Sequence, residues 1–356
     1  MLKVQPTSEV PTQLASRMLR CPPSTPPWQP NASFPLRVFM EVSPQWTWGR
    51  RVCGALRDFA ATSEHPVCFV GTREGADVEL VHLDRETEAS RALSRPAHAP
   101  PFVAFQHGLA FADAPRSLFR AVWTRSILTV SFQDLAADAR NASFAFMPMP
   151  WGADDGMFTP SSTDTHPTTR RSILMMGDQP DIESLGEILF AAAHANLTVR
   201  HIGDPINQLC GACGRFLTTP FLCQPLDALG GRSPCAFHTN LGRVSDAQLV
   251  KEMREALYVP ALRKFEGFEI SGAEALFCGT RPIVYDISTY RWYTGHAEFV
   301  PSGLESTALF HRLVGIFQRS PQPVSRSELR ELHATFAWGR LVPRLFARIR
   351  ERLAVG

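Results

Sequence analysis

The chain has 356 residues, with 36 lysines and arginines against 34 aspartates and glutamates and a formal net charge of +2. This length allows two domains with complete cores, and the nearly balanced charge gives no global sign of a polyanionic partner. Because no apolar run reaches the roughly 18 residues that cross a bilayer, we expect no membrane span. The first 30 residues lack the apolar segment of a secretory signal, so we expect a cytoplasmic protein.

The N-terminal part of the chain begins the pattern of an α/β protein. Residues 1–34 form a Pro-rich, weakly structured leader, which is either an arm across the surface or disordered. An apolar run at 35–42 predicts a first buried strand, and apolar residues at helical spacing predict a helix at 52–61. Between them lies SPQWTWGRR, in the first βα turn, on the edge where open α/β sheets bind ligands. Its Trp46 and Trp48 either stack on a sugar ring or a base, or pack as part of a lid.

Strand and helix patterns alternate through the rest of the chain. Further strands are predicted at 65–71, 78–83 and 101–108. A polar, Thr-rich run then predicts a linker. Beyond the linker we expect elements at 172–178, 184–195, 197–203, 247–257 and 340–353. Repeated β–α alternation predicts parallel sheets covered by helices, an α/β fold.

Eight cysteines are present. In a chain without a secretory signal they favour free thiols or a metal over disulfides. The interval 205–241 has a CxxC turn followed by two further cysteines, which suits a structural zinc. The four candidate ligands are Cys210, Cys213, Cys223 and Cys235. The alternative is an inserted surface loop with incidental thiols or a local disulfide.

The stretch from Lys264 to Asp286 holds the most specific pattern. Glu266 and Glu274 lie on either side of a predicted helix start, and Gly279 falls where a left-handed C-cap residue belongs. A helix N-terminus offers free backbone N–H groups and a positive dipole end, which suit a phosphate. The two carboxylates suit hydroxyl-rich groups on either side of it, so the arrangement matches a sugar nucleotide. The alternative is a helix start that contains glutamate only because the dipole favours it.

This stretch resembles the signature of the retaining GT-B-fold glycosyltransferases, the family-4-like group with the E-x7-E motif (glycosyl transferases group 1), E-G-F-G-L-P-x-x-E-A-M-A-C-G-T-P-V-V. The matching positions are Glu266, Gly267, Phe268, Glu274, Ala275, Cys278, Gly279 and Thr280. The sequence departs from the pattern at Glu269, where the family has Gly, and at Ser271, where it often has Pro. With weaker similarities at 144–160 and around Phe336 to Trp338, the resemblance covers about residues 35–353.

The resemblance implies a GT-B fold, in which two Rossmann-like, doubly wound domains face each other across a cleft and a C-terminal helix crosses back to the N-domain. Catalysis in this fold requires no obligatory metal. The implied parts are a leader at 1–34, an N-terminal acceptor-side domain at 35–160, a linker at 161–171, a C-terminal nucleotide-sugar-binding domain at 172–335 with a Cys-containing insertion at 205–241, and a returning helix at 336–356.

The resemblance also implies roles for particular residues. Glu266 and His107 would act on the transferred sugar, and Glu274 would bind the ribose; for His107 the alternative is a histidine satisfied within a strand-end turn. Relatives grip the diphosphate with basic residues after the glycine, but here the loop DQPDIESLG is acidic, so Arg263 and Lys264 are expected to supply the charge. The other donor-side residues are Gly177, Gly267, Phe268, Ile270, Ser271 and Gly272, and the acceptor-side residues are Trp46, Trp48 and Arg50.

We therefore expect a hexosyl- or pentosyltransferase that moves a sugar from a nucleotide-diphosphate sugar to an acceptor hydroxyl, with retention of configuration. The acceptor stays open between a glycan, a lipid-linked saccharide, a small molecule and a modified DNA base. One alternative is a DNA-modifying glycosyltransferase that acts on a hydroxylated base, with the basic final helix as a duplex platform. The other is a degenerate sugar-nucleotide-binding protein, which Glu269 and the acidic Gly177 loop favour.

Overall fold

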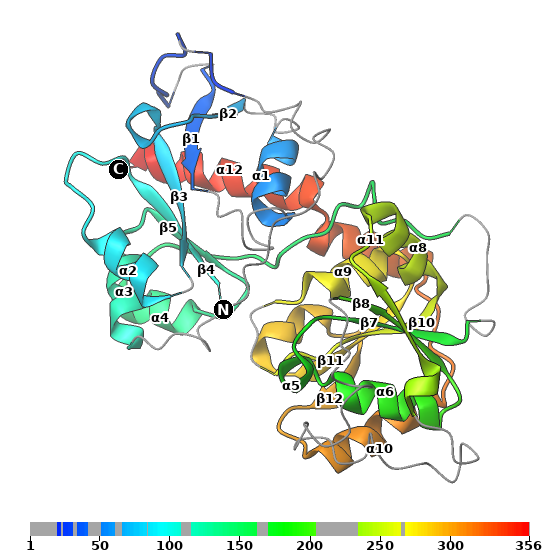
Figure 1. The fold of residues 1–356 in the computed structure, drawn as a ribbon. Coiled ribbons are helices and arrows are strands. Elements are labelled where there is room, and N and C mark those ends of the chain that lie inside the picture. The colour runs from blue at the N-terminus through cyan, green and yellow to red at the C-terminus, as the bar shows by residue number, and fades with distance from the viewer. Residues whose placement is uncertain are drawn as a thin grey trace, which may run out of the picture.

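The computed structural model describes residues 20–22, 24–30, 34–41, 51–60, 66–83, 85–107, 115–161, 170–203, 234–264 and 268–355. Within these ranges lie two six-stranded parallel sheets flanked by helices (Figure 1). Strands such as β4 (Phe102–Gln106) and β10 (Ala256–Ala261) are buried along their whole length, as in parallel sheets covered on both faces. The α/β class expected from the sequence is confirmed. None of the helices in these ranges is long and apolar enough to span a membrane.

The first sheet has the strand order β2-β1-β3-β4-β5-β6. Its strands are β1 (Leu36–Met40), β2 (Val67–Phe69), β3 (Val78–Leu83), β4, β5 (Leu128–Ser131) and β6 (Phe146–Pro148). Its helices are α1 (Cys53–Ala60), α2 (Glu86–Leu93), α3 (Arg116–Arg125) and α4 (Ala136–Ala142), with the 3-10 turn η3 (Arg73–Gly75). Since β2 pairs on one side of β1 and β3 on the other, the direction of winding switches between β1 and β3.

The second sheet has the order β12-β11-β10-β7-β8-β9. Its other strands are β7 (Ser172–Met176), β8 (Thr198–Ile202), β9 (His238–Gly242), β11 (Arg281–Asp286) and β12 (Glu298–Pro301). Its helices are α5 (Pro180–Glu183), α6 (Leu185–His194), α8 (Asp246–Glu255), α9 (Ile270–Phe277) and α10 (Ser306–Phe317), with the 3-10 helices η7 (Pro234–Phe237) and η8 (Ser288–Tyr293). Here the winding switches between the paired strands β7 and β10, the position where doubly wound sheets bind ligands.

The chain returns to the first domain through its last two helices, α11 (Arg326–Phe336) and α12 (Trp338–Val355) (Figure 1). The crossing starts where Ala337 bridges to Ala153. In α12 the ring of Phe346 then packs edge-on against Phe69 of β2, with 6.4 Å between the ring centres. The expected returning helix is therefore confirmed, and it contains Pro343 in its interior.

Local signals in the sequence placed several element ends correctly. The Ser245 hydroxyl accepts a hydrogen bond from the backbone N–H of Gln248 at 3.3 Å and caps α8. Gly279 has φ +79° just after α9, the left-handed position expected of it. The structure describes only the end of the interval 205–241, and those residues form η7 and most of strand β9.

The expectation of free thiols is wrong for three cysteines. Cys21 and Cys68 form a disulfide that ties the N-terminal arm to β2, and Cys235 is disulfide-bonded as well. Cys53 and Cys278 are free and buried. The partners Cys21 and Cys68 are 47 residues apart and meet only because the arm lies along the sheet edge. Disulfides are rare in cytosolic proteins, so this bond is at odds with the cytoplasmic location expected above.

Where the chain crosses back to the first domain, Gly152 is packed so closely that an added methyl group would not fit. A Cβ there would lie 2.5 Å from the Phe336 carbonyl oxygen and 2.8 Å from the Trp338 ring. We expect Gly152→Ala to lower the free energy of unfolding by about 1–3 kcal/mol because the core has no room to relax. Denaturant titration measures the effect.

Gly54→Ala is the matched control for this substitution. A Cβ at Gly54 in α1 meets nothing within 4 Å, and alanine is the better helix former. Gly54→Ala should therefore keep or raise the stability. Equal losses in the two variants would contradict the importance of the crossing.

Candidate functional site

The candidate site lies at the carboxyl ends of β7 and β10, at the switch point of the second sheet. Gly177 follows β7, Arg263 follows β10, and Glu269 precedes α9. The Arg263 Nη1 atom lies 3.8 Å from Oε1 of Glu183 and 3.6 Å from Oε1 of Glu269. Glu183 ends the short helix after the Gly177 loop, so Arg263 connects that loop to the start of α9. Tertiary structure thus brings together three segments that the sequence assigned to a single site.

The carboxylate of Glu183 lies against Gly177. Gly177 has φ +131°, which favours glycine, and a Cβ at this position would overlap the Glu183 carboxylate. The backbone N–H of Gln179 donates to Glu183 Oε2 at 2.8 Å. The buried His201 donates its Nε2–H to the Gly177 carbonyl at 2.7 Å. Its Nδ1 atom accepts a hydrogen bond from Asn240 at 3.1 Å. An internal anion is therefore bound by a backbone N–H at the place where a phosphate was expected.

The groups around this loop shift the pKa of Glu183 in opposite directions. Burial is the main reason why the pKa of Glu183 is raised, and the neighbouring Glu269 and Asp178 raise it further. The hydrogen bond from Gln179 and the positive charge of Arg263 lower the pKa in part. The guanidinium group of Arg263 thus faces the carboxylates of both Glu183 and Glu269. The site is therefore acidic, as the sequence of the loop suggested.

The start of α9 offers backbone donors to the same edge. The helix begins at Ile270, so the N–H groups of Ile270 and Ser271 lie in a first turn that has no intrahelical acceptor for them. The Gly272 N–H is already engaged, because it donates to the Glu269 carbonyl at 3.1 Å. Tyr293 donates its hydroxyl to the same carbonyl at 2.6 Å, and a side chain at position 272 would collide with its ring. Gly272 therefore positions Tyr293 and holds the helix start.

Glu274 lies one turn inside α9 and is almost completely buried. Its Oε1 atom is 3.2 Å from Nη1 of Arg51, which lies two residues before α1 in the first domain. Arg51 also pairs with Asp246 at 3.1 Å. Burial raises the pKa of Glu274 to about 7 even though Arg51 lowers it. The predicted ribose ligand is thus paired across the domain boundary with a cation that the sequence analysis did not single out.

His107 follows β4 in the first domain, half-buried among aromatic rings. Its ring stacks on Trp151 at 6.0 Å and meets His82 edge-on at 5.2 Å. Burial is the main cause that lowers the pKa of His107 to about 4, and the positive charge of Arg263 adds to it. His107 is therefore neutral at pH 7. It lies close enough to Arg263, on the other domain, for the charge of Arg263 to lower its pKa.

Phe268 joins the site to the first domain. It is 4 % exposed, and its ring lies 5.2 Å from that of Tyr293 and 5.9 Å from that of Phe132. The Trp292 indole N–H donates to the Phe132 carbonyl at 2.7 Å. The predicted donor-side residue Phe268 is thus part of the packing that holds the domains together.

Several predicted residues are not brought into this geometry. Lys264 donates its backbone N–H to the Ile182 carbonyl at 2.9 Å, while the residue itself is exposed. Cys235, as a disulfide partner, is no free thiolate for the expected zinc, and the described ranges hold no cluster of three or more residues suited to a metal. Outside the described residues lie Glu266, Gly267, Trp46, Trp48, Arg50, Cys210, Cys213 and Cys223.

Two residues of the site, Arg51 and Glu183, were not predicted from the sequence. Arg51 follows the predicted Arg50 directly, and the pair Arg50-Arg51 before a predicted helix was the available signal. Glu183 lies in the acidic loop that was already noted, but nothing in its spacing showed that its carboxylate would lie on Gly177. Both contacts depend on how the chain folds back on itself.

Comparisons with known proteins show the fold. No protein-family model and no curated protein matches the sequence. Among solved structures, Anabaena Alr3699/HepE in complex with UDP and glucose superposes with a TM-score of 0.59 and 12% identity, over 88% of this chain and 99% of that one. Sucrose-phosphate synthase from Thermosynechococcus elongatus (TM-score 0.57, 13% identity, 89% and 81% covered) and the lipopolysaccharide outer core galactosyltransferase WaaB (0.57, 12%, 90% and 100%) are similar.

These similar structures are GT-B glycosyltransferases that share both domains with this chain, although the sequence identities are low. The two six-stranded parallel sheets, the order of their strands and the crossing of α12 agree with that architecture. The chain therefore has the GT-B fold that the resemblance implied.

The raised pKa of Glu274 predicts a pH-dependent cost in stability. A carboxyl whose pKa rises from 4.5 to about 7 on folding favours the folded state when protonated. The stability should therefore fall as the pH rises from about 4.5 to about 7, by up to about 3 kcal/mol. Glu274→Gln should remove this slope, which denaturant titrations at pH 5, 6, 7 and 8 would measure.

The control for this experiment is Glu86→Gln, which removes an exposed carboxylate at the start of α2. It should leave the pH profile of the stability unchanged. If Glu274→Gln and the unmodified chain lose stability in parallel as the pH rises, the burial of an ionisable group at this position is refuted.

Proposed function

We propose that this chain is a glycosyltransferase, a hexosyl- or pentosyltransferase, that moves a sugar from a nucleotide-diphosphate sugar to an acceptor hydroxyl with retention of configuration. The observation that carries the proposal is the meeting of the Gly177 loop, Arg263 and the start of α9, with Glu274 inside that helix. The family-4-like signature covers the same helix. In this proposal residues 35–160 bind the acceptor and residues 172–335 bind the donor.

The diphosphate would bind between Arg263 and the first turn of α9. Free N–H groups and the dipole of a helix start favour an anion, and a guanidinium group adds a bidentate, charge-assisted contact. HepE, which has the same fold, was solved with UDP and glucose and with UDP-glucose. This likeness supports a nucleotide-sugar donor for the present chain.

Glu274 would bind the ribose of the donor. A carboxylate can accept hydrogen bonds from two neighbouring hydroxyl groups, and the buried position of Glu274 strengthens such bonds. In the described state its oxygen is paired with Arg51. Donor binding would replace this ion pair, so Arg51 neutralises the carboxylate when no donor is present.

His107 and Glu266 would act on the transferred sugar. Because His107 is neutral at pH 7, one ring nitrogen can donate and the other accept a hydrogen bond without the cost of a buried charge. Retention would follow if the leaving diphosphate takes the proton of the acceptor hydroxyl on the same face of the sugar. No residue role in this scheme requires a metal.

A degenerate sugar-nucleotide-binding protein is the second candidate. It is favoured by the carboxylates of Glu183 and Glu269, which both lie within 4 Å of Arg263 and compete with a diphosphate for it. Such a protein would bind the nucleotide without turnover. Measurement of product release separates the two candidates.

The transferase proposal predicts that both signature glutamates are needed for turnover. Glu274→Ala and Glu266→Ala should each abolish transfer, because one removes the ribose ligand and the other the contact to the sugar. Release of the nucleotide diphosphate from UDP-, GDP- and dTDP-sugars with candidate acceptors is the measurement. Glu86→Ala serves as a control for folding, and full turnover in either signature variant would refute the assignment.

Glu183 should weaken donor binding in its charged form. Glu183→Gln keeps the shape of the side chain and removes its charge, so one of the two carboxylates that compete with a diphosphate for Arg263 is lost. We expect UDP to bind about three- to tenfold more tightly to Glu183→Gln than to the unmodified chain at pH 8. Calorimetric titration at pH 8 and at stepwise lower pH measures the difference.

The difference between Glu183→Gln and the unmodified chain should shrink as the pH is lowered, because the raised pKa of Glu183 lets the native carboxyl gain a proton at a higher pH than an ordinary glutamate. Glu86→Gln should bind UDP as the unmodified chain does. Weaker binding of UDP to Glu183→Gln would show that the carboxylate supports the site and does not compete with the donor.

A further inference from the structure

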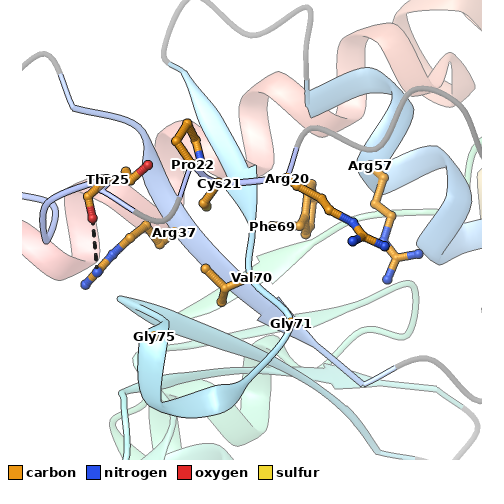
Figure 2. Close-up of a pocket in the computed structure, with 10 residues that line it drawn as sticks. All are labelled: Arg20, Cys21, Pro22, Thr25, Arg37, Arg57, Phe69, Val70, Gly71 and Gly75. Carbon is orange, nitrogen blue, oxygen red and sulfur yellow. Dashed lines mark hydrogen bonds between the residues drawn. The ribbon is translucent and has the colours of Figure 1, made fainter.

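A hollow of about 410 Å³ lies in the first domain and shares no residue with the candidate site (Figure 2). It is bounded by the N-terminal arm, β1, α1 and the segment that follows β2. Three arginines line it, Arg20, Arg37 and Arg57, whereas no carboxylate among the described residues does. The excess of positive charge sets this hollow apart from the acidic site in the second domain.

The three arginines differ in whether they form an ion pair with a carboxylate. The guanidinium group of Arg37 lies 2.7 Å from Asp77, whose other oxygen accepts the Arg37 backbone N–H at 2.8 Å. In the part of the chain that the structure describes, Arg20 and Arg57 have no ion-pair partner. Asp58 adjoins Arg57 in the chain but does not line the hollow. Two guanidinium groups that form no ion pair among the described residues therefore face the same space.

Phe69 holds the two arginines together. The guanidinium group of Arg57 lies over its ring, 5.9 Å from the ring centre, a contact that orients the planar group. Arg20 forms a parallel bridge to Phe69 through the backbone. In Figure 2 the side chains of Arg20 and Arg57 both extend to the side of the hollow next to Phe69. Phe69 thus orients the Arg57 guanidinium group and anchors the backbone of Arg20.

The disulfide fixes the arm that bears Arg20. Cys21 donates its backbone N–H to the Phe69 carbonyl at 3.2 Å and is bonded to Cys68, the residue before Phe69. The position of Arg20 beside the sheet is therefore held covalently. Further along the arm, the Trp28 backbone N–H donates to Asp77 at 3.2 Å, so the disulfide is the anchor nearest to Arg20.

We propose that this hollow binds the anionic group of a sugar-sized ligand, a phosphate, sulfate or carboxylate that Arg20 and Arg57 hold together. Two guanidinium groups in one hollow repel each other, and an anion between them removes that repulsion and gains charge-assisted hydrogen bonds. The volume lies within the range of small-molecule sites, and Phe69 offers an apolar face to the body of the ligand. The inference does not depend on the glycosyl transfer proposed above.

Titration calorimetry of the full chain with three probes tests the proposal. Glucose 6-phosphate and glucuronate carry a phosphate and a carboxylate on the same kind of ring, and glucose is the neutral control. We expect at least one of the two anions to bind and glucose not to bind. The double variant Arg20→Gln, Arg57→Gln should weaken that binding by about tenfold or more because both charges are lost.

Three further measurements keep the proposal falsifiable. Arg91→Gln, an exposed substitution in α2 outside the hollow, should leave anion binding unchanged. Cys21→Ser should weaken anion binding, because Arg20 loses its covalent anchor. Thermal unfolding shows whether each variant is folded. Equal binding of glucose, or anion binding that survives the double variant, would overturn the proposal.

Discussion

The two domains meet along a seam on which the candidate site depends. The Trp292 indole donates to the Phe132 carbonyl at 2.7 Å, and the rings of Phe132 and Phe268 lie 5.9 Å apart. At the same seam Arg51 of the first domain pairs with Glu274 of the second at 3.2 Å. The helix α12 crosses back from the second domain and packs on the first sheet, so it adds a further link between the two domains. Opening this seam would expose the buried carboxylate of α9.

The charges of the site are balanced internally before any ligand arrives. Arg263 lies between Glu183 and Glu269, and Arg51 neutralises Glu274. In the proposed function, a diphosphate would have to replace the Glu183 carboxylate at Arg263, which links its affinity to the protonation of Glu183. The hollow next to Phe69 has the opposite character, since two of its arginines have no carboxylate to replace. The two regions would accordingly differ in how their affinity for an anion changes with pH.

Much of the donor side could be predicted from the sequence, because it consists of local patterns. The glycine after the first strand of the second domain, the helix that starts at Ile270 and the left-handed Gly279 each follow from a few neighbouring residues. The acidity of the Gly177 loop was evident as well. That Glu183 would lie on Gly177 could not be predicted, since it depends on the path of α5 relative to β7.

The sequence by itself determined the α/β class, the parallel sheets and the limits of the helix within 264–286, because periodicity and capping are properties of residues close together in the chain. Only the tertiary structure decided that Arg51 pairs with Glu274 and that Cys21 bonds to Cys68. These contacts join segments that are far apart in the chain, and their approach depends on the packing of both domains. No local pattern contains that information, which is why the expected free thiols proved to be a disulfide and the cation facing Glu274 was missed.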